Sequence, residues 1–458
     1  MLTTDLQSLS GVLCVCNKEK PDAYFEYNNS VVTLIPMTEE CSRYCYNERN
    51  EETRNIKEWF YGYVTDGSRI VFYKNNYFKI LITSPITLHP IKFYTPLIIK
   101  SKNNENVDKI EFNKIIFKNK IINLLYPPDN AEEKIDTPES CSFNIKYNTN
   151  LKWKHNIEIA NEKFHFIYGV QVLDKWEIGK VYDAINNVNS YIKLEYDRLK
   201  SLEDILKYYF YVQKLCQFCS KTLNVGFDIS LLCPRTININ GQNHNTEIEF
   251  IVYIDDGYED YSHDKLNFYK TIKLFALDNH LSELMKVINE DTTSPYLNFL
   301  PKKNKDLNKI LYQDIIDICV AVEREFTLLN FEKNEKLIEE AKNLTKFLLK
   351  EIKSYECDSK IKQKANNILG AQLKKYSPSL KDKILKLNEH FNKDIQSSDS
   401  FSSKVSDFVQ MRNNMSHSGI KFNDGIQIYD KIENLIYYSI LHRAGFSIKE
   451  SKAILPNL

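Results

Sequence analysis

The stretch WFYGYVTDGSRIVFYKNNYFKILIT, residues 59–83, decides the fold of the N-terminal part of the chain. Its runs of aromatic and β-branched residues are typical of β-strands. Asp66-Gly67 is a strong two-residue hairpin signal between two such runs, and Asn75-Asn76 is a weaker one further along. The stretch therefore predicts an antiparallel meander.

Further strands and one helix are predicted around this meander. Ser201 and Asp204 form a capping-box signature, after which apolar residues recur at helical spacing from Ile205 to Leu223. The additional strand-like segments are residues 110–125, 142–147, 164–173, 226–232 and 247–254. We therefore expect an antiparallel sheet or sandwich with one inserted helix.

The C-terminal third has a different periodicity. Its apolar residues recur every three or four positions, the spacing of amphipathic helices that pack as a bundle. A Ser-rich loop, residues 396–403, precedes a helix that ends near Gly419. The other stripes are residues 311–329, 337–355, 380–391 and 424–443.

The predicted fold class is therefore α+β, with the strands first and the helices last. We expect a β-rich domain at residues 1–195, a mixed α/β continuation at 196–291, a Pro-rich and polar linker at 292–307 and a helical bundle at 308–458.

Composition limits the class of protein. The 458 residues include 61 basic and 61 acidic side chains, and 43% are hydrophobic, which fits a globular chain and excludes a collagen-like or disordered one. Ten cysteines are too sparse for a secreted disulfide scaffold. No run approaches the roughly 18 apolar residues of a membrane helix. We expect a cytoplasmic protein with no membrane partner.

The common enzyme motifs are missing from the sequence. Its 12 glycines form neither GxGxxG nor GxxxxGK[ST], and there is no GxSxG, HExxH or EF-hand pattern. We therefore predict no cofactor.

Two groups of side chains invite a metal interpretation. One is an acidic run that could hold Mg²⁺ for a nuclease, with a solvated turn as the alternative: Asp255, Asp256, Glu259, Asp260 and Asp264. The other is three cysteine pairs: Cys14 with Cys16, Cys41 with Cys45, and Cys216 with Cys219. The last pair lies on an apolar helical stripe, and the first two lack zinc-knuckle spacing, so we predict no metal site.

The most informative motif is FVQMRNNMSHSG, residues 408–419, in which Arg412 and His417 are separated by four residues and Asn413 directly follows the arginine. Arg412 continues the apolar stripe of its helix, four residues beyond Phe408. A buried guanidinium needs a partner. Glu323, beside the stripe of the first bundle helix, is a candidate, with a solvated Glu as the alternative.

Arg-Asn-x3-His at the end of a bundle helix resembles the hallmark motif of HEPN-domain ribonucleases. The whole arrangement looks like the ApeA-type HEPN proteins of bacterial abortive-infection defence against phage. The resemblance also includes WFYGYVTDGSRIVFY, KLEYDRLKSLEDILKYY and the AVE sequence at 321–323. One subset of the family continues its motif as H-x-Y, whereas Gly419 stands at that position here. The resemblance implies an RNA substrate, a homodimer, and an N-terminal region that senses a phage-derived trigger or restrains the enzyme.

The residue chemistry suggests a metal-independent mechanism. RNA carries its own nucleophile, so cleavage needs proton transfer and a cation at the phosphate, which His417 and Arg412 can supply. Asn413 lies four residues before His417 and could orient the imidazole. Positions five apart diverge by about 140° around a helix, so we expect two copies to share one cleft.

The segment 342–386 contains 12 lysines and four acidic residues, a surplus suited to an RNA backbone, with a solvated Lys-rich face as the alternative. The competing hypothesis for the whole protein is a non-catalytic dimerisation or RNA-binding scaffold in which Arg412 and His417 are structural.

Overall fold

The structure is a computed structural model. It describes residues 8–16, 20–47, 58–74, 91–101, 110–135, 144–172, 188–239, 241–255, 271–291, 293–307, 309–331, 335–372, 378–392, 399–418 and 424–455. The chain divides into two compact units. Unit 1 comprises residues 1–290 and 301–307, and unit 2 comprises residues 291–300 and 308–458.

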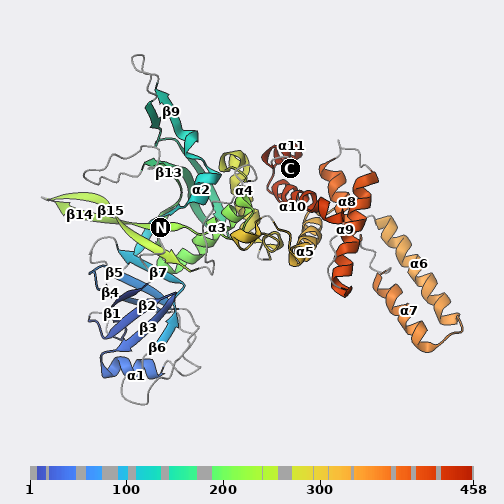
Figure 1. Ribbon diagram of the computed structural model, residues 1–458, viewed down its shortest axis with the longest axis horizontal. Coiled ribbons are helices and arrows are strands. Elements are labelled where there is room, and N and C mark those ends of the chain that lie inside the picture. The colour runs from blue at the N-terminus through green and yellow to red at the C-terminus, as the bar shows by residue number, and fades with distance from the viewer. Residues whose placement is uncertain are drawn as a thin grey trace. The chain divides into compact units, whose positions relative to one another are not determined.

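Unit 1 contains a thirteen-stranded sheet in which every described pairing is antiparallel (Figure 1). In sheet order the strands are β11 (Lys152–Ile159), β12 (Glu162–Val172), β13 (Val188–Ser201), β8 (Glu111–Lys118), β14 (Asp228–Ile239), β15 (Gln242–Ile254), β7 (Leu97–Ser101), β5 (Arg69–Lys74), β4 (Glu58–Val64), β1 (Leu9–Cys14), β2 (Ala23–Asn28), β3 (Val31–Pro36) and β6 (Ile91–Tyr94). A separate two-stranded sheet pairs β9 (Glu132–Ile135) with β10 (Asn144–Tyr147). The N-terminal antiparallel architecture is confirmed, as one large sheet.

The hairpin predicted at Asp66-Gly67 connects β4 and β5. Gly67 has a φ of +83°, a conformation that glycine adopts without a steric penalty. The Ser68 backbone N–H donates to Asp66 Oδ1 at 2.8 Å, which closes the turn. The second turn, at Asn75-Asn76, lies outside the described residues.

The described residues of unit 1 also form four α-helices. They are α1 (Glu39–Asn47), α2 (Lys120–Leu125), α3 (Ile205–Ser220) and α4 (Leu281–Glu290). The stripe predicted from Ile205 to Leu223 is buried, and α3 is its helical part. The predicted capping box is wrong, because Ser201 makes no side-chain cap bond and a 3-10 turn precedes α3. The strand predicted over residues 110–125 is wrong in its second half, where α2 buries Ile121, Ile122 and Leu125.

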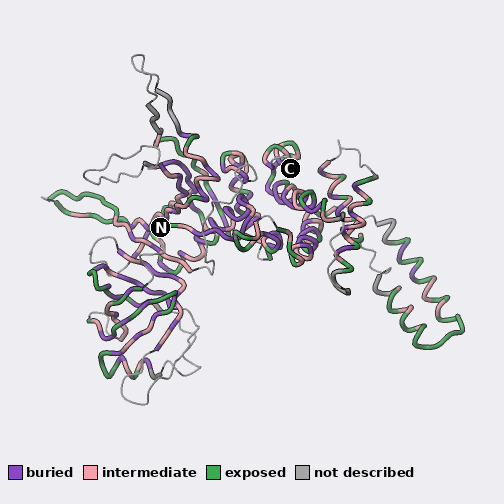
Figure 2. The backbone as a smooth tube through the Cα atoms, viewed as in Figure 1, coloured by how far each residue is buried: buried purple, intermediate pink, exposed green. Residues whose placement is uncertain are grey.

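The core of unit 1 follows the period-two alternation of its strands (Figure 2). In β2, for example, Phe25 is buried while Tyr24 and Glu26 are exposed. One hydrophobic cluster joins β1–β6 to α1 and includes Cys41 and Cys45 from that helix. The cluster fixes α1 against the sheet.

Unit 2 is helical, as predicted. Its α-helices are α5 (Tyr312–Leu328), α6 (Glu335–Ser354), α7 (Ser359–Gln372), α8 (Leu380–Phe391), α9 (Asp399–Ser418), α10 (Tyr429–Arg443) and α11 (Ile448–Ile454). The stripe of α8 is confirmed, because Ile384, Leu387 and Phe391 are buried and Ser379 caps the helix through the Asp382 backbone N–H. Helices α5, α8, α9, α10 and α11 pack on one another, and α6 packs on α7.

Three sequence expectations for unit 2 need correction. Helix α9 begins at Asp399, so the second half of the Ser-rich segment is helical. The stripe predicted for α6 is not buried along its length, since Leu344 and Tyr355 are exposed. At the N-cap of α5, Leu311 is exposed, and within the helix Glu325 is buried, which is the reverse of the pattern expected from hydrophobicity alone.

The segment 292–307 contains the boundary between the two units. Within unit 2, a 3-10 turn at Pro295–Leu297 packs on α5, and Tyr296, Phe299 and Leu300 are buried. No helix among the described residues is long and apolar enough to cross a membrane.

Candidate functional site

Helix α9 carries the R-x4-H motif. Its apolar residues recur at helical spacing, and Phe401, Val405, Phe408 and Met411 are buried where the helix packs on α5 and α8. The helix is continuous from Asp399 to Ser418, so the whole motif lies on one rigid element.

Arg412 lies at the edge of this buried face. It is half-buried, and its Nη1 donates to Asn413 Oδ1 at 3.2 Å. Burial raises the pKa of Cys319 on α5 to about 12 although the Arg412 charge lowers it. The guanidinium is therefore close to α5 while Asn413 remains exposed.

The other motif residues are placed less fully. Position 417 lies in the last turn of α9, as predicted, but the side chain of His417 and all of Gly419 are outside the described residues. Arg412 and Asn413 are brought together, and the role predicted for Asn413 at the imidazole stays a prediction.

Glu323 has a different observed contact from the one predicted. Its Oε1 accepts a hydrogen bond from Lys383 Nζ of α8 at 3.4 Å, and its side chain is about half exposed. An exposed pair of this kind contributes little to stability.

Sequence reasoning missed a buried ion pair in the same bundle. Glu325 is 2% exposed and accepts two hydrogen bonds from Arg443 of α10, at 2.9 Å from Nε and 2.8 Å from Nη2. Burial raises the pKa of Glu325, and the Arg443 charge opposes this shift. The sequence feature that could have indicated this pair is the position of Glu325, an acidic residue three positions after Val322 on the buried stripe of α5.

Two histidines were also missed. The rings of His390 and His442 have centres 5.5 Å apart, and both contact the Phe391 ring. His442 Nδ1 donates to the Phe446 carbonyl at 3.4 Å. His390 and His442 are the two histidines of unit 2 whose side chains the structure describes. His442 can therefore serve as a control for substitution of His417.

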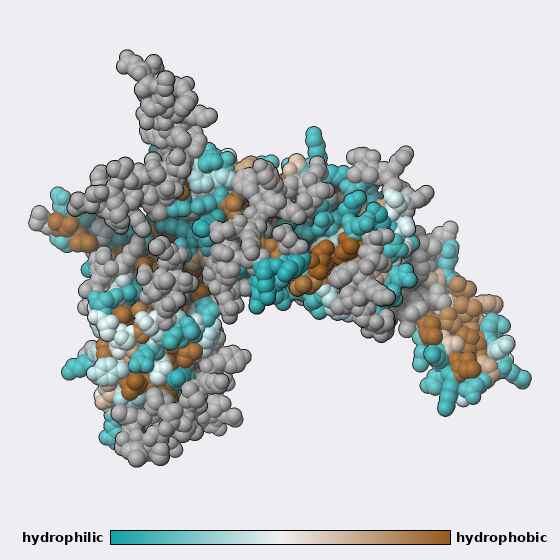
Figure 3. All heavy atoms as spheres, viewed as in Figure 1, coloured by the Kyte–Doolittle hydropathy of each residue, from teal (hydrophilic) through white to brown (hydrophobic). Residues whose placement is uncertain are grey.

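The Lys-rich segment lies on α6, α7 and the start of α8. Lys346, Lys350, Lys353, Lys360 and Lys364 are exposed, so their charges are accessible to a polyanion. The same hairpin has apolar residues on its surface, visible in Figure 3 on α6 and α7.

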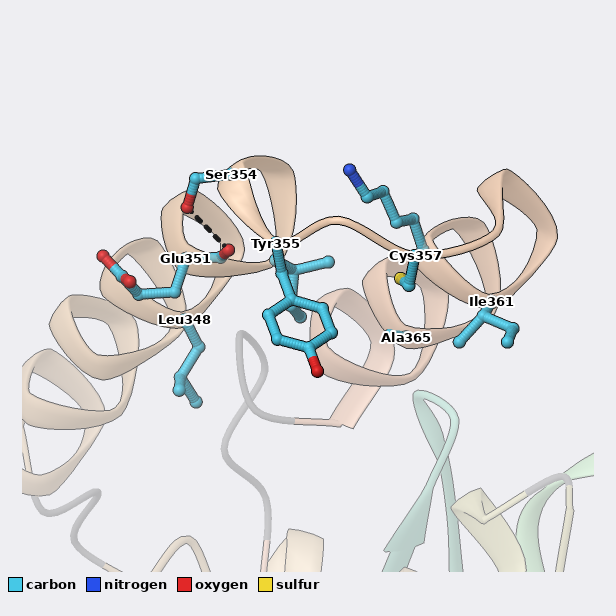
Figure 4. A pocket seen from close by; sticks show the side chains of 9 residues that line it. Leu348, Glu351, Ser354, Tyr355, Cys357, Ile361 and Ala365 are labelled. Atoms are coloured by element: carbon cyan, nitrogen blue, oxygen red, sulfur yellow. Dashed lines mark hydrogen bonds between the residues drawn. The ribbon is translucent and has the colours of Figure 1, made fainter.

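A groove of about 660 Å³ lies between α6 and α7 (Figure 4). Leu348, Ile352, Tyr355 and Ile361 contribute apolar walls, and Tyr355 is 70% exposed. The groove contains no pair of acid and base side chains at hydrogen-bond distance among the described residues, so it is not a catalytic candidate.

In unit 1, the acidic run is described only at its first residue. Asp255 Oδ2 accepts a hydrogen bond from Tyr94 at 2.9 Å, and the remaining four acidic residues lie outside the described residues. The prediction of no metal site in this run stays a prediction, with Mg²⁺ binding as the alternative.

A second polar cluster in unit 1 joins β11, β12 and a 3-10 helix at Leu274–His280. His155 Nε2 lies 3.1 Å from Asp278 Oδ1, and Tyr168 also donates to that carboxylate. Burial and the hydrogen bond to Asp278 raise the pKa of Tyr168 far above its usual value. Asp278 and Trp153 line a pocket of about 260 Å³. Sequence spacing gave no signal for this contact across 123 residues.

Of these clusters, the α9 motif has the chemistry best suited to a phosphodiester. Arg412 provides a permanently charged planar donor group at the end of a packed helix, and a titratable imidazole follows five positions later. No family model, curated protein or solved structure matches the chain.

Proposed function

We propose that the protein is a cytoplasmic, metal-independent endoribonuclease whose cleavage site combines Arg412 and His417 from two copies of the chain. The observation that carries the proposal is that positions 412, 413 and 417 share one continuous helix, with the Arg412 guanidinium at the edge of its buried face. The order of the fold, with a β-rich unit followed by a helical one, also fits the resemblance to ApeA-type HEPN proteins.

The chemistry follows from the substrate. The 2′-hydroxyl of RNA attacks the adjacent phosphorus, and the bond to the 5′-oxygen breaks. One imidazole takes the proton from the 2′-hydroxyl, and a second protonates the leaving oxygen. Arg412 binds the non-bridging oxygens and stabilises the additional negative charge of the transition state. The products are a 2′,3′-cyclic phosphate and a 5′-hydroxyl.

The continuous helix supports the requirement for two copies. Because α9 has no break between Arg412 and Ser418, positions 412 and 417 are separated by about 140° around its axis. Two α9 helices related by a two-fold axis would bring an arginine from one copy to a histidine from the other. The same pairing provides the two imidazoles that acid and base catalysis need.

Asn413 has a positioning role in this proposal. Its Oδ1 accepts a hydrogen bond from Arg412 Nη1 at 3.2 Å, which restricts the orientation of the guanidinium. A preorganised donor loses less entropy when it binds phosphate.

The exposed lysines of α6 and α7 would attract the RNA backbone without reading its sequence. Unit 1 would restrain the ribonuclease until a phage-derived trigger binds, since an unregulated ribonuclease would kill its host. This regulatory role follows from the resemblance.

Total RNA incubated with the purified chain in the presence of EDTA tests the proposal. We expect fragments that end in 2′,3′-cyclic phosphates, and we expect His417→Ala to lower the cleavage rate at least about 100-fold. Gln410→Ala, an exposed neighbour on α9, and His442→Ala, at another imidazole of unit 2, are the matched controls and should retain cleavage.

Cleavage that persists in a folded His417→Ala protein would contradict the proposal. Ends that carry a 3′-hydroxyl, together with a requirement for added Mg²⁺, would instead support a nuclease built on the acidic run at Asp255. In cells, the proposal predicts that expression of the wild type with its trigger stops growth and that His417→Ala restores growth.

One observation favours the scaffold hypothesis. The Arg412 charge acts on the buried Cys319 of α5, so the guanidinium could serve bundle packing. A structural role predicts that Arg412→Ala lowers the melting temperature of unit 2, and that Arg412→Lys restores stability. The catalytic role predicts that Arg412→Lys restores folding without restoring cleavage, because lysine lacks the planar fork.

A further inference from the structure

Two cysteines that are far apart in the sequence, Cys16 and Cys41, converge on Asp22 in unit 1. The Sγ atoms of Cys16 and Cys41 and a carboxylate oxygen of Asp22 all lie within 4.8 Å of one another. Cys45 lies four residues after Cys41 on α1, and its thiol interacts with that of Cys41. Sequence spacing did not predict this cluster, because its members come from the end of β1 and from α1.

Local structure holds each member in place. Cys41 and Cys45 are one helical turn apart on α1 and project from the same face. The Thr38 hydroxyl accepts a hydrogen bond from the Cys41 backbone N–H at 3.2 Å, which caps the helix. Cys41 is therefore in the first turn, where the helix dipole favours a thiolate.

Asp22 connects the cysteine-bearing segments. It is 4% exposed, and its two carboxylate oxygens accept hydrogen bonds from the backbone N–H groups of Val15 at 2.7 Å and Cys16 at 2.8 Å. Its backbone carbonyl accepts from Met37, just before α1, at 2.8 Å. These bonds orient the carboxylate, one oxygen of which lies within 4.8 Å of the Cys16 and Cys41 sulfur atoms.

The geometry points to a structural zinc site in which the thiolates of Cys16 and Cys41 and the Asp22 carboxylate bind the ion, and Cys45, one helical turn after Cys41, turns in as the fourth ligand. A tetrahedral zinc with Zn–S bonds of about 2.3 Å requires sulfur atoms about 3.8 Å apart. The ligand atoms of Cys16, Cys41 and Asp22, all within 4.8 Å of one another, need only a small contraction to reach this spacing. Three thiolates with one carboxylate select zinc over the harder cations Mg²⁺ and Ca²⁺.

The thiols would bind the ion as thiolates, because a thiol that coordinates a divalent cation loses its proton.

The alternative is that these thiols serve only as small apolar side chains, as Cys216 and Cys219 do inside α3. Those two cysteines are completely buried, and among the described residues neither belongs to a group of His, Cys, Asp and Glu side chains that could hold a metal ion. Cys16 differs because it is partly exposed, which gives an ion a path from solvent. The zinc would join the turn after β1 to α1 and so hold this helix against the sheet.

Metal content of the full-length chain, purified under reducing conditions without added zinc, tests this inference. We expect about one zinc per chain by elemental mass spectrometry. Cys41→Ser should lower bound zinc at least about 10-fold, whereas the matched control Cys357→Ser, at an exposed cysteine of unit 2, should leave it unchanged. Replacement of zinc by Co²⁺ should give a thiolate-to-cobalt charge-transfer band in the wild type and the control.

Asp22→Asn and removal of the metal from the wild type keep the inference testable if Cys41→Ser fails to fold. Chelation should lower the melting temperature of unit 1, and added zinc should restore it. Absence of zinc together with a melting temperature that chelation does not change would overturn the inference. A disulfide between any two of the three cysteines in the native protein would also overturn it. Because these measurements involve no RNA, their outcome is independent of the proposed function.

Discussion

Units 1 and 2 differ in how they complete their chemistry. In unit 1, polar and thiol groups from distant segments meet inside the same chain, as at Cys16, Cys41 and Asp22 and at the His155–Asp278 pair. In unit 2, the α9 motif distributes Arg412 and position 417 around a helix, and the α6–α7 hairpin exposes large apolar side chains. Unit 2 also joins Glu325 and Arg443 within one chain, but its α9 motif does not converge in this way, and under the proposed function it acts with a second copy.

The largest expected effect tests whether the ribonuclease site is shared between copies. Arg412→Ala and His417→Ala should each lower cleavage at least about 100-fold. If an arginine from one copy acts with a histidine from the other, a mixture of the two variants contains heterodimers with one Arg412–His417 pair but a single imidazole. Because random assortment makes half of the dimers heterodimers, we expect recovery above either variant alone and below about a quarter of wild-type activity after the two proteins are unfolded together and refolded.

No recovery in such mixtures would mean that each chain uses its own Arg412 and His417, or that neither residue is catalytic. The control is a mixture of either variant with itself, treated in the same way. Size-exclusion chromatography with light scattering must show that the mixture contains dimers, because monomers would also prevent recovery.

The second effect concerns the stability of unit 2 alone. Glu325→Ala leaves the buried Arg443 charge without its carboxylate, and we expect a loss of about 3–5 kcal/mol in the free energy of unfolding. Replacement of both residues by leucine should cost far less, since no buried charge remains. Lys383→Ala, which breaks the exposed pair with Glu323, should cost less than about 1 kcal/mol.

The two units can be followed separately in these experiments. Trp59, Trp153 and Trp176 all lie in the sequence of unit 1, so tryptophan fluorescence reports on that unit. The circular-dichroism signal of α-helices reports more strongly on unit 2, which is the helical unit. Glu325→Ala should shift the circular-dichroism transition in urea and leave the fluorescence transition in place, and a common shift of both would contradict the division of stability between the units.

A pH experiment gives the corresponding measurement for unit 1. Glu162 is hydrogen-bonded to Lys200 at 2.7 Å and paired with Lys207 at 3.1 Å, and these contacts hold its pKa at about 2. Because the folded pKa lies below the unfolded value of about 4.5, protonation favours the unfolded chain. The stabilisation is complete above pH 4.5 and decreases as the pH falls toward 2.

We expect this pair to contribute about 1–2 kcal/mol less at pH 3 than at pH 6. Urea unfolding followed by tryptophan fluorescence measures the difference. Glu162→Gln should reduce the pH dependence of unit 1 in this range by that amount, and the transition of unit 2 should be unaffected. An unchanged pH dependence would show that Glu162 does not titrate as the geometry implies.

The sequence predicted those parts of the fold that depend on local patterns. The turn at Asp66-Gly67 and the stripe of α8 were correct because backbone geometry and periodicity act over a few residues. The continuous helix that carries Arg412 was correct for the same reason, although it starts within the predicted Ser-rich loop. Residues 120–125 were wrong because Ile and Leu in a short run fit a strand or a buried helix equally well.

The remaining features depend on contacts that spacing cannot show. The sheet places β8 between β13 and β14, and this order results from pairing between distant segments. The Cys16–Cys41 contact likewise needs both strand register and the position of α1. Glu325 was missed because a charge on an apolar stripe is expected to be solvated until its partner, 118 residues away, is known.

The smallest expected effect tests the exposed hairpin of unit 2. Phe347 is 58% exposed and Ile361 is 62% exposed, so their substitution by serine removes little buried surface within one chain. We expect each change to alter the free energy of unfolding by less than about 0.5 kcal/mol, whereas Phe408→Ala, in the buried face of α9, should cost about 3–5 kcal/mol. Urea titrations at two protein concentrations measure both.

A cost for Phe347→Ser that is larger than expected and grows with protein concentration would mean that a second copy covers this surface, because stability then depends on association. A large cost that is independent of concentration would instead mean that the hairpin is buried within the single chain, and the contrast between the two units would be lost.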